Sequence, residues 1–349
     1  DWSSDVCSSD LSDINKLWEI ENGPFNPISL SVEDKRVLDL WDNTCKFVDG
    51  HYMLPIPWKD PSEPLPNNFS VAVKRLDNLV KRLTKTDLSS RYNQEIAKLI
   101  DSKYAEIIPD HDLHKSNRIW YLPHHGVVNP NKPGKLRVVF DCSAKYAGRS
   151  LNERCLQGPD LVNKLLFVLL RFRLHEYGVQ GDIKEMYNQI LIPEYDRDAL
   201  CFLWHQNGKL VHMRMRVNVF GGIWCSSSST YALRRVVLDN PNIDPLFKEA
   251  ILHSMYVDDL TQSLRSISEV RNIIFNFPDA LRLGGFEITK FAVNDEQTVD
   301  QIPIESRAKE IHEFSAGSHC RALGVKWMVK KDLFCFEVRQ FDFEQLTRH

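Results

Sequence analysis

Apolar residues recur with a helical period in several segments of the chain. The clearest case follows Ser70, which can cap a helix. Its apolar stripe has spacings of four, three and four residues and consists of Ala72, Leu76, Leu79 and Leu83. The other helices predicted from this period cover residues 32–47, 94–104, 161–172 after a cap at Asp160, a Ser-rich segment from Ser226, and 268–284 before Gly284-Gly285.

Short apolar runs between turn residues predict strands. The predicted strands cover residues 118–122, 135–141, 178–183, 189–192, 200–204 and 209–215, with turns over 129–134 and at Gly208. Residues 251–264, divided by two acids, predict a β-hairpin, and 321–338 predict a last one. Helices and strands intermix without a regular βαβ alternation, which favours an α+β fold.

The composition indicates a folded chain of two or three compact units. It has 349 residues, of which 43% are hydrophobic. The longest aliphatic or aromatic run, Leu165 to Leu170, is far shorter than the ~20 residues that cross a bilayer, so we expect no membrane association. The eight cysteines are dispersed without close pairs, which is typical of a reduced intracellular protein.

The first eleven residues are polar and lack any period. With ordinary codons they back-translate to a string similar to a common sequencing-library adapter. We therefore interpret residues 1–11 as an assembly artefact and leave them out of fold reasoning.

Charge is unevenly distributed, although the net charge is only -3. Residues 1–50 carry eleven acids against four bases, and residues 115–173 carry eleven bases against three acids. The basic segment includes Trp120, Tyr121 and Phe140, a mixture that suits phosphate contact and base stacking. The alternative interpretation is a solvated face.

Two short motifs bring carboxylates to the ends of apolar strands. Asp258 and Asp259 lie between two apolar arms, and Asp182 ends the predicted strand 178–183. Because side chains alternate along a strand, the adjacent pair can converge only in a tight turn. Carboxylate oxygens are hard ligands for Mg²⁺, and three acids around two ions suit in-line phosphoryl transfer. The alternative is a polar turn without chemistry.

The surrounding motifs resemble reverse transcriptases, specifically the polymerase of Pao/BEL-type LTR retrotransposons, over about residues 12–338. The segments that carry the resemblance are Tyr256 to Asp259, Asp182 to Gln189, Trp120 to His125, Lys135 to Asp141, Ser150 to Asn152, Gly158 to Leu161 and Asp196 to Leu200. The loop from Phe220 to Ser226 departs from the family pattern, since Cys225 and Ser226 replace a Ser-Pro step.

The resemblance implies roles for individual residues. Asp182 and Asp258 would hold two Mg²⁺ ions, or Mn²⁺ in their place, with Asp259 as a supporting ligand. Lys135 and Arg137 would bind the triphosphate of the incoming nucleotide. The remaining assignments are Tyr187 against a ribose 2′-hydroxyl, Phe220 and Gly221 in a loop facing the template, Lys290 as the basic residue of the next motif, and Leu323 to Trp327 as the primer hairpin.

The resemblance also implies a right-hand polymerase with fingers and palm, the palm being an antiparallel sheet backed by helices. The implied segments are a linker (12–69), fingers in two parts (70–155 and 190–222), palm in two parts (156–189 and 223–338) and a truncated connection to a thumb (339–349). Thumb, RNase H and integrase segments would follow in a polyprotein, and the location would be cytoplasmic in a virus-like particle, or nuclear.

The implied reaction is DNA synthesis from dNTPs on a primed RNA or DNA template. Two alternatives stay open. An RNA-templated RNA polymerase shares the carboxylate geometry, but Tyr187 argues against it. A degenerate or domesticated copy would bind RNA without catalysis; the intact acids argue against it, whereas the altered loop and the truncation argue for it.

Overall fold

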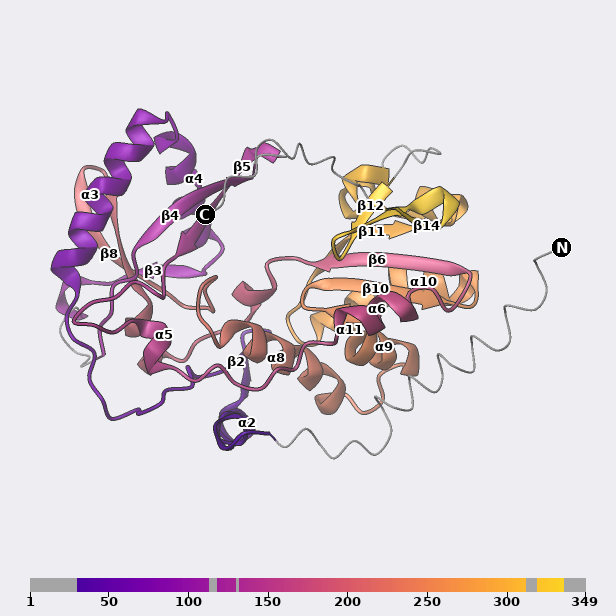
Figure 1. The fold of residues 1–349 in the computed structure, drawn as a ribbon, viewed down its shortest axis with the longest axis horizontal. Coiled ribbons are helices and arrows are strands. Elements are labelled where there is room, and N and C mark those ends of the chain that lie inside the picture. Colours follow the sequence, from indigo (N-terminus) through magenta and orange to yellow (C-terminus); the bar gives the residue numbers. More distant parts are fainter. Residues whose placement is uncertain (1–29, 113–117, 130–131, 312–318, 336–349) are drawn as a thin grey trace, which may run out of the picture.

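The computed structural model describes residues 30–112, 118–129, 132–311 and 319–335, and shows an α+β fold of two units (Figure 1). The predicted artefact segment 1–11 and the predicted thumb connection 339–349 lie outside the described residues. None of the helices described there is long and apolar enough to span a bilayer.

The first unit, called here the four-stranded unit, contains an antiparallel sheet with the order β11-β6-β10-β9. Its strands are β6 (Tyr177–Ile183), β9 (Met255–Tyr256), β10 (Asp259–Leu264) and β11 (Ile288–Val293). Helices pack below this sheet in Figure 1, namely α6 (Leu165–Arg171), α8 (Cys225–Asp239), α9 (Pro245–Glu249), α10 (Ile267–Phe275) and α11 (Phe277–Arg282). The sheet is therefore antiparallel and backed by helices, as the sequence predicts.

A small sheet closes this unit at the start of β6. It consists of β12 (His319–Ala322), β13 (Val325–Met328) and β14 (Leu333–Cys335), after α12 (Glu296–Gln301). Trp327 is fully buried against Phe172, with ring centroids 4.9 Å apart. The predicted hairpin over 321–338 is thus a three-stranded sheet in its described part.

The second unit, called here the hairpin unit, combines a three-stranded sheet with a long hairpin and with helices. Its strands are β3 (Ala105–Ile107), β7 (Cys201–Gln206), β8 (Lys209–Met215), and the hairpin strands β4 (His124–Asn129) and β5 (Lys132–Phe140). Its helices are α3 (Phe69–Lys85), α4 (Ser89–Asp101), and the short α5 (Leu151–Arg154) and α7 (Glu194–Arg197). The predicted stripe of α3 is buried, which confirms its period.

Each unit has its own hydrophobic core, and the chain passes between the two cores repeatedly. Cys155 belongs to the core of the hairpin unit and Leu156 to that of the four-stranded unit. The chain returns between Ile190 and Ile192, and leaves again after Cys225. Neither unit is therefore a continuous stretch of sequence.

The segment before α3 packs on both cores. It forms α2 (Val32–Thr44), β1 (Lys46–Val48) and β2 (His51–Met53). Trp41 is fully buried in the four-stranded unit, whereas Trp58 lies in the hairpin unit. The buried carboxylate of Asp196 accepts hydrogen bonds from Trp58 Nε1 (2.8 Å) and from the Ile56 amide (3.0 Å). The described part of this predicted linker is thus integral to the fold.

Several predicted helix boundaries differ from those in the structure. The first helix ends at Thr44, and Phe47 lies in β1. The α3 N-cap is Asn68 rather than Ser70, and its side chain bonds the backbone of Tyr121 instead of the helix. Helix α4 begins five residues earlier than predicted, α6 begins at Leu165 rather than after Asp160, and the predicted helix over 268–284 breaks at Asn276 before Pro278.

Two predicted strands are also wrong. Residues 118–122 make only an isolated bridge at Tyr121, and the strand before the turn is β4. Of residues 189–192, Gln189 ends a short 3₁₀ helix and Leu191 makes single bridges. In the hairpin predicted over 251–264, Ala250–Ser254 form a π-helix, so the strands pair only from Met255.

Candidate active site

The three predicted acids converge where β6 meets the β9–β10 turn. Asp182 and Asp259 stand directly opposite each other in the antiparallel register of β6 and β10. Asp258 lies in the turn, and its carbonyl oxygen accepts a hydrogen bond from the Ile183 amide at 2.7 Å. Val257 precedes it with φ +55°, a left-handed conformation that costs a β-branched residue energy. The turn is tight and strained, and it brings the carboxylates together.

Burial and neighbouring carboxylates raise the pKa of Asp258 and Asp259. Burial is the largest cause of the rise for Asp259, and the charges of Asp258 and Asp182 add to it, which brings its pKa to about 7. Burial likewise raises the pKa of Asp258, with a further rise from Asp182. The cluster therefore holds negative charge that the protein compensates only in part.

Lys290 supplies part of that compensation. It lies on β11 with φ +57°, within an irregularity in the pairing of β11 with β6. Its Nζ contacts Asp182 Oδ1 at 2.5 Å. Among the described residues, no three His, Cys, Asp or Glu side chains already stand in the close arrangement of a preformed metal site. A cation that binds Asp182 Oδ1 would compete with the lysine ammonium for this oxygen.

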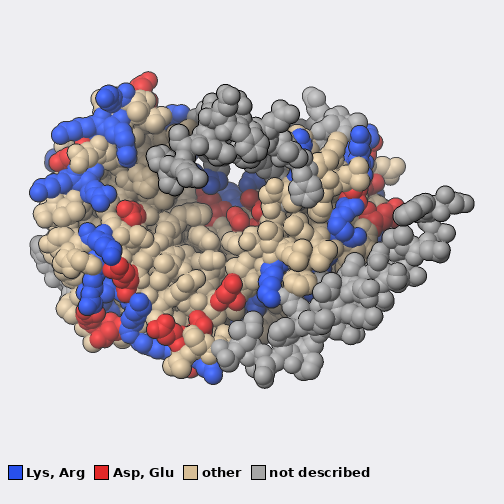
Figure 2. All heavy atoms as spheres, in the orientation of Figure 1, with Lys and Arg blue, Asp and Glu red and all other residues tan. Residues whose placement is uncertain are grey.

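Arg137 lies on β5 in the hairpin unit, and its positive charge acts on Asp258 of the same cluster. Its side chain is exposed, and its charge opposes the rise in the pKa of Asp258. The backbone of Lys135 lies two residues earlier on β5, but its side chain lies outside the described residues. Figure 2 shows acidic and basic side chains together in the hollow between the two units.

Tyr187 lies beside this cluster in the 3₁₀ turn Met186–Gln189. The side chain is half-buried, and its ring centroid is 4.8 Å from that of Phe220, which is 46% exposed. Burial raises the pKa of the phenol, a hydrogen bond with Ser226 opposes the rise, and the charge of Asp258 adds to it. Tyr187 is thus neither a fully buried core residue nor a free surface residue.

The loop after Phe220 is held against the end of β5. Gly221 has φ +123°, and a Cβ there would clash with the Phe140 carbonyl oxygen. Asn152 donates to the Gly221 carbonyl at 2.9 Å and accepts from the Ile223 amide at 3.1 Å. Sequence reasoning gave Asn152 no such role; the Ser150–Glu153 capping box, which fixes its turn, is the signal that could have drawn attention to it.

Trp224 and Cys225, in the part of this loop that departs from the family pattern, are both buried. Trp224 is fully buried and donates its Nε1–H to Asn218 Oδ1 at 3.1 Å. Cys225 is buried, and burial raises the pKa of its thiol to about 12, as in a small core residue and not in a reactive thiol. The described cysteines are all free.

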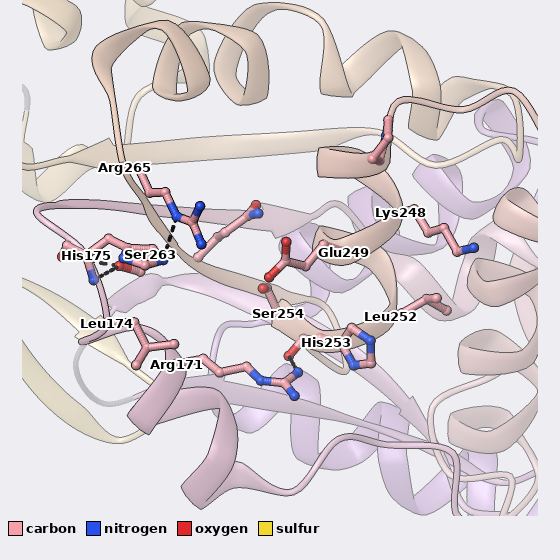
Figure 3. A pocket seen from close by; sticks show the side chains of 12 residues that line it. Arg171, Leu174, His175, Lys248, Glu249, Leu252, His253, Ser254, Ser263 and Arg265 are labelled. Atoms are coloured by element: carbon pink, nitrogen blue, oxygen red, sulfur yellow. Dashed lines mark hydrogen bonds between the residues drawn. The ribbon is translucent and has the colours of Figure 1, made fainter. Parts of the chain in front are cut away.

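A cavity lies away from the three carboxylates, in the four-stranded unit (Figure 3). It has a volume of about 570 Å³ and lies between α6, the π-helix and the far end of β10, with Arg171, His253 and Arg265 among its lining residues. Asp182, Asp258 and Asp259 do not line it.

No protein-family model and no curated protein matches this sequence. Among solved structures, the chain is similar to the foamy viral protease-reverse transcriptase in complex with an RNA/DNA hybrid (TM-score 0.49, 15% identity, 91% of this chain and 35% of that chain). It is also similar to a foamy viral protease-reverse transcriptase in complex with double-stranded DNA (TM-score 0.47, 15% identity, 91% and 46%). The chain thus spans about a third to a half of the length of these proteins.

Proposed function

We propose that this chain is the polymerase part of a reverse transcriptase of the Pao/BEL type, which adds dNTPs to a primer on an RNA or DNA template. The observation that carries the proposal is the direct pairing of Asp182 with Asp259, with Asp258 in the adjoining turn. The four-stranded unit would be the palm and the hairpin unit the fingers.

The donor set fits a pair of Mg²⁺ ions, or Mn²⁺ in their place. Burial, and after it the charges of Asp258 and Asp182, raise the pKa of Asp259, so a nearby cation would stabilise the carboxylate form. Carboxylates are also the ligands that hard divalent ions prefer. Asp182 and Asp258 would hold the ions, with Asp259 in support. When bound, the ions would supply positive charge at the primer hydroxyl and at the triphosphate.

The chain's own residues would position the nucleotide. Arg137, with Lys135, would bind the triphosphate from the fingers side, since a forked guanidinium suits phosphate oxygens. Tyr187 would lie beneath the sugar, and the loop at Phe220 and Gly221 would face the template. Lys290 would leave Asp182 and become available to the triphosphate.

The wider setting is part of the same proposal. Thumb, RNase H and integrase segments would follow in the polyprotein, and synthesis would take place in a cytoplasmic particle or in the nucleus. These features come from the resemblance of the sequence motifs.

Single-nucleotide addition tests the proposal with the least demand on processivity. Purified protein, poly(rA)/oligo(dT), dTTP and Mg²⁺ should give an extended primer, and Asp182→Asn or Asp258→Asn should lower the rate by several orders of magnitude. Asp101→Asn, at an exposed acid at the end of α4, is the matched control and should leave the rate unchanged. Asp258→Asn at the wild-type rate would remove the proposal.

The same assay separates the alternatives. Extension with UTP but not dTTP would support the RNA polymerase, and template binding without any addition in Mg²⁺ or Mn²⁺ would support the degenerate copy. Arg137→Ala should raise the KM for dTTP more than it weakens primer–template binding. A loss confined to primer–template affinity would place Arg137 on the template instead.

A further inference from the structure

The cavity of Figure 3, called here the α6 cavity, has more basic than acidic side chains in its lining. Its permanent cations are Arg171 of α6, Lys248 of α9 and Arg265, which follows β10. Glu249 is the one acid that lines it in the described part of the chain. Figure 3 shows Arg171, Glu249 and Arg265 around the same hollow, although they come from different segments. These three cations and one carboxylate carry a net charge of +2, so the cavity favours an anion.

The α6 cavity lies beside the part of β10 that β9 does not reach. Only two residues of β9 pair with β10, and Ala250–Ser254 before them form the π-helix. Within the described ranges, β10 therefore has no strand on that side beyond Leu260. Gln262 and Ser263, in this stretch of β10, line the cavity. Single π-helical turns are frequent at functional sites, and this one adjoins an unpaired strand edge.

Gln262 brings an unsatisfied polar atom to the cavity. Its side chain is only 3% exposed, and its Oε1 has no hydrogen-bond partner among the described residues. A buried acceptor without a donor lowers the stability of the folded state. An N–H or O–H group of a bound molecule would supply the missing donor. The cavity thus suits a molecule that has a hydrogen-bond donor as well as negative charge.

Hydrogen bonds to neutral groups hold the two arginines. Arg171 Nη1 donates to the His253 carbonyl oxygen at 3.4 Å, and Arg265 Nε donates to His175 Nε2 at 3.4 Å. Arg265 and Lys248 make no ion pair with any residue that the structure describes. A phosphate group would therefore gain charge-assisted hydrogen bonds from these two side chains without first breaking an ion pair.

The size of the cavity and the apolar part of its lining indicate a ligand larger than an ion. Its volume of about 570 Å³ lies within the range of about 300–1,000 Å³ that is usual for small-molecule sites. Leu174, Leu252 and Pro245 offer it apolar surface for a ring. A phosphate monoester carries a charge of about -1.5 to -2 at neutral pH, which matches the net charge of the lining. A nucleoside monophosphate combines this charge with a flat ring and N–H donors.

We propose that the α6 cavity binds a nucleoside monophosphate. Its phosphate would contact Arg171 and Arg265, its base would pack on the apolar lining, and an N–H of the base would donate to Gln262 Oε1. The proposed site is separate from the carboxylates and does not depend on the proposed function.

Isothermal titration calorimetry with AMP tests the proposal. The full chain is titrated in EDTA and without primer–template, so that no metal-dependent nucleotide site contributes. Arg265→Gln should weaken AMP binding about tenfold, because it removes charge-assisted hydrogen bonds to the phosphate. Arg271→Gln is the matched control, since Arg271 is an exposed base on the neighbouring α10 and does not line the cavity. It should bind AMP as the wild type does.

Two further variants separate binding from folding. Gln262→Met replaces the orphaned acceptor by an apolar group of similar size, so it should weaken AMP binding several-fold without lowering the Tm of the free protein. Glu249→Gln removes the acid from the lining and should tighten AMP binding about two- to threefold. Misfolding cannot imitate such a gain.

Several outcomes would overturn the proposal. They are no binding of AMP, inorganic phosphate bound as tightly as AMP, hexaglutamate bound more tightly than AMP, and an equal loss in Arg271→Gln. Loss of AMP binding in Arg137→Ala would also overturn it, because the nucleotide would then lie at the carboxylate site. If AMP binds as expected but primer extension fails, the α6 cavity stands as a nucleotide site and the proposed reaction falls.

Discussion

At the scale of single residues, backbone pairing holds Asp182, Asp258 and Asp259 close together although their negative charges repel one another. The strand register fixes Asp182 opposite Asp259, and Lys290 neutralises only part of the resulting field. Residues that serve a site in this way commonly reduce the stability of the fold. In the absence of metal, the three acids should therefore lower the stability of the folded state.

The first prediction concerns pH. The folded state raises the pKa of Asp259 from 3.8 to about 7, so it favours the neutral acid. The stability contributed by this group is present below pH ~4 and is lost as the pH rises through ~7. In EDTA, Asp259→Asn should therefore have a higher Tm than wild type at pH 8 and a weaker decline between pH 5 and 8. A Tm below that of wild type at pH 8 would contradict this.

The second prediction concerns sugar selection by Tyr187. Its half-buried ring rests on Phe220, so Tyr187→Ala should open space beneath the sugar and admit rNTPs while dNTP use largely persists. Discrimination from sterics and an unpaired hydroxyl is on the order of 10²-fold or more. Competition of dTTP against UTP measures it, and Tyr187→Phe, which keeps the ring, is the control that should still discriminate.

A purely structural Tyr187 predicts a different outcome. Tyr187→Ala would then lose about 3–5 kcal/mol of stability, with no gain in rNTP use. Thermal melts beside the competition assay decide between the two, and a stable Ala variant that still excludes rNTPs would rule out the sugar gate.

At the scale of elements, the loop after Phe220 depends on a single backbone conformation. Gly221 combines a positive φ with contact against the Phe140 carbonyl oxygen, and Asn152 fixes the loop from the other side. The end of β5 and the start of α8 are thereby locked in position next to Tyr187. A small change in the conformation of this loop should therefore move both the end of β5 and the start of α8.

The third prediction compares two glycines. Gly221→Ala should lower both Tm and the rate of nucleotide addition, because it adds a clash to the strain of a positive φ. Gly208→Ala is the control, since Gly208 also has a positive φ (+75°) but open space around its Cβ position. It should lose only about 1–2 kcal/mol of stability. Equal losses in the two variants would show that the contact with Phe140 is unimportant.

Local sequence patterns predicted those elements in which buried apolar residues recur at regular spacing. The stripe of α3 and the apolar strand β6 are examples, and the two acids in a turn predicted the β9–β10 hairpin. Patterns failed where a distant contact decides: Asn68 bonds Tyr121 across 53 residues, and residues 189–192 run between two cores instead of joining a sheet. Asp182 lies opposite Asp259 because of the register between β6 and β10, and the spacing of residues along the sequence does not determine that register.

At the scale of the whole molecule, two cores share one discontinuous chain, and the segment before α3 joins them. Asp196 is the buried anchor of this segment in the hairpin unit, and burial raises its pKa despite the hydrogen bonds from Trp58 and Ile56. Trp41 anchors the other end in the four-stranded unit. The cleft between the units is therefore set partly by this segment.

The fourth prediction tests that anchor. Asp196→Ala leaves two buried donors without their acceptor and should lower stability by about 2–5 kcal/mol. Proteolysis of the folded protein should then cut first between α2 and α3. The exposed Asp101→Ala is the control. Unchanged proteolysis in Asp196→Ala would mean that the segment is held by its apolar contacts alone.

The central position of β6 has a consequence for how the protein is made. Both neighbours of β6 in the sheet come later in the chain, and β10 begins about 75 residues after β6 ends. At translation rates of roughly 5–20 residues per second, the finished strand waits for roughly 4–15 s with both edges open. Open, apolar strand edges invite association with other nascent chains. Asp182 lies near the end of this strand, and a charge on an open edge opposes such association, so an acid that we propose as a metal ligand would also protect the unfinished chain from aggregation.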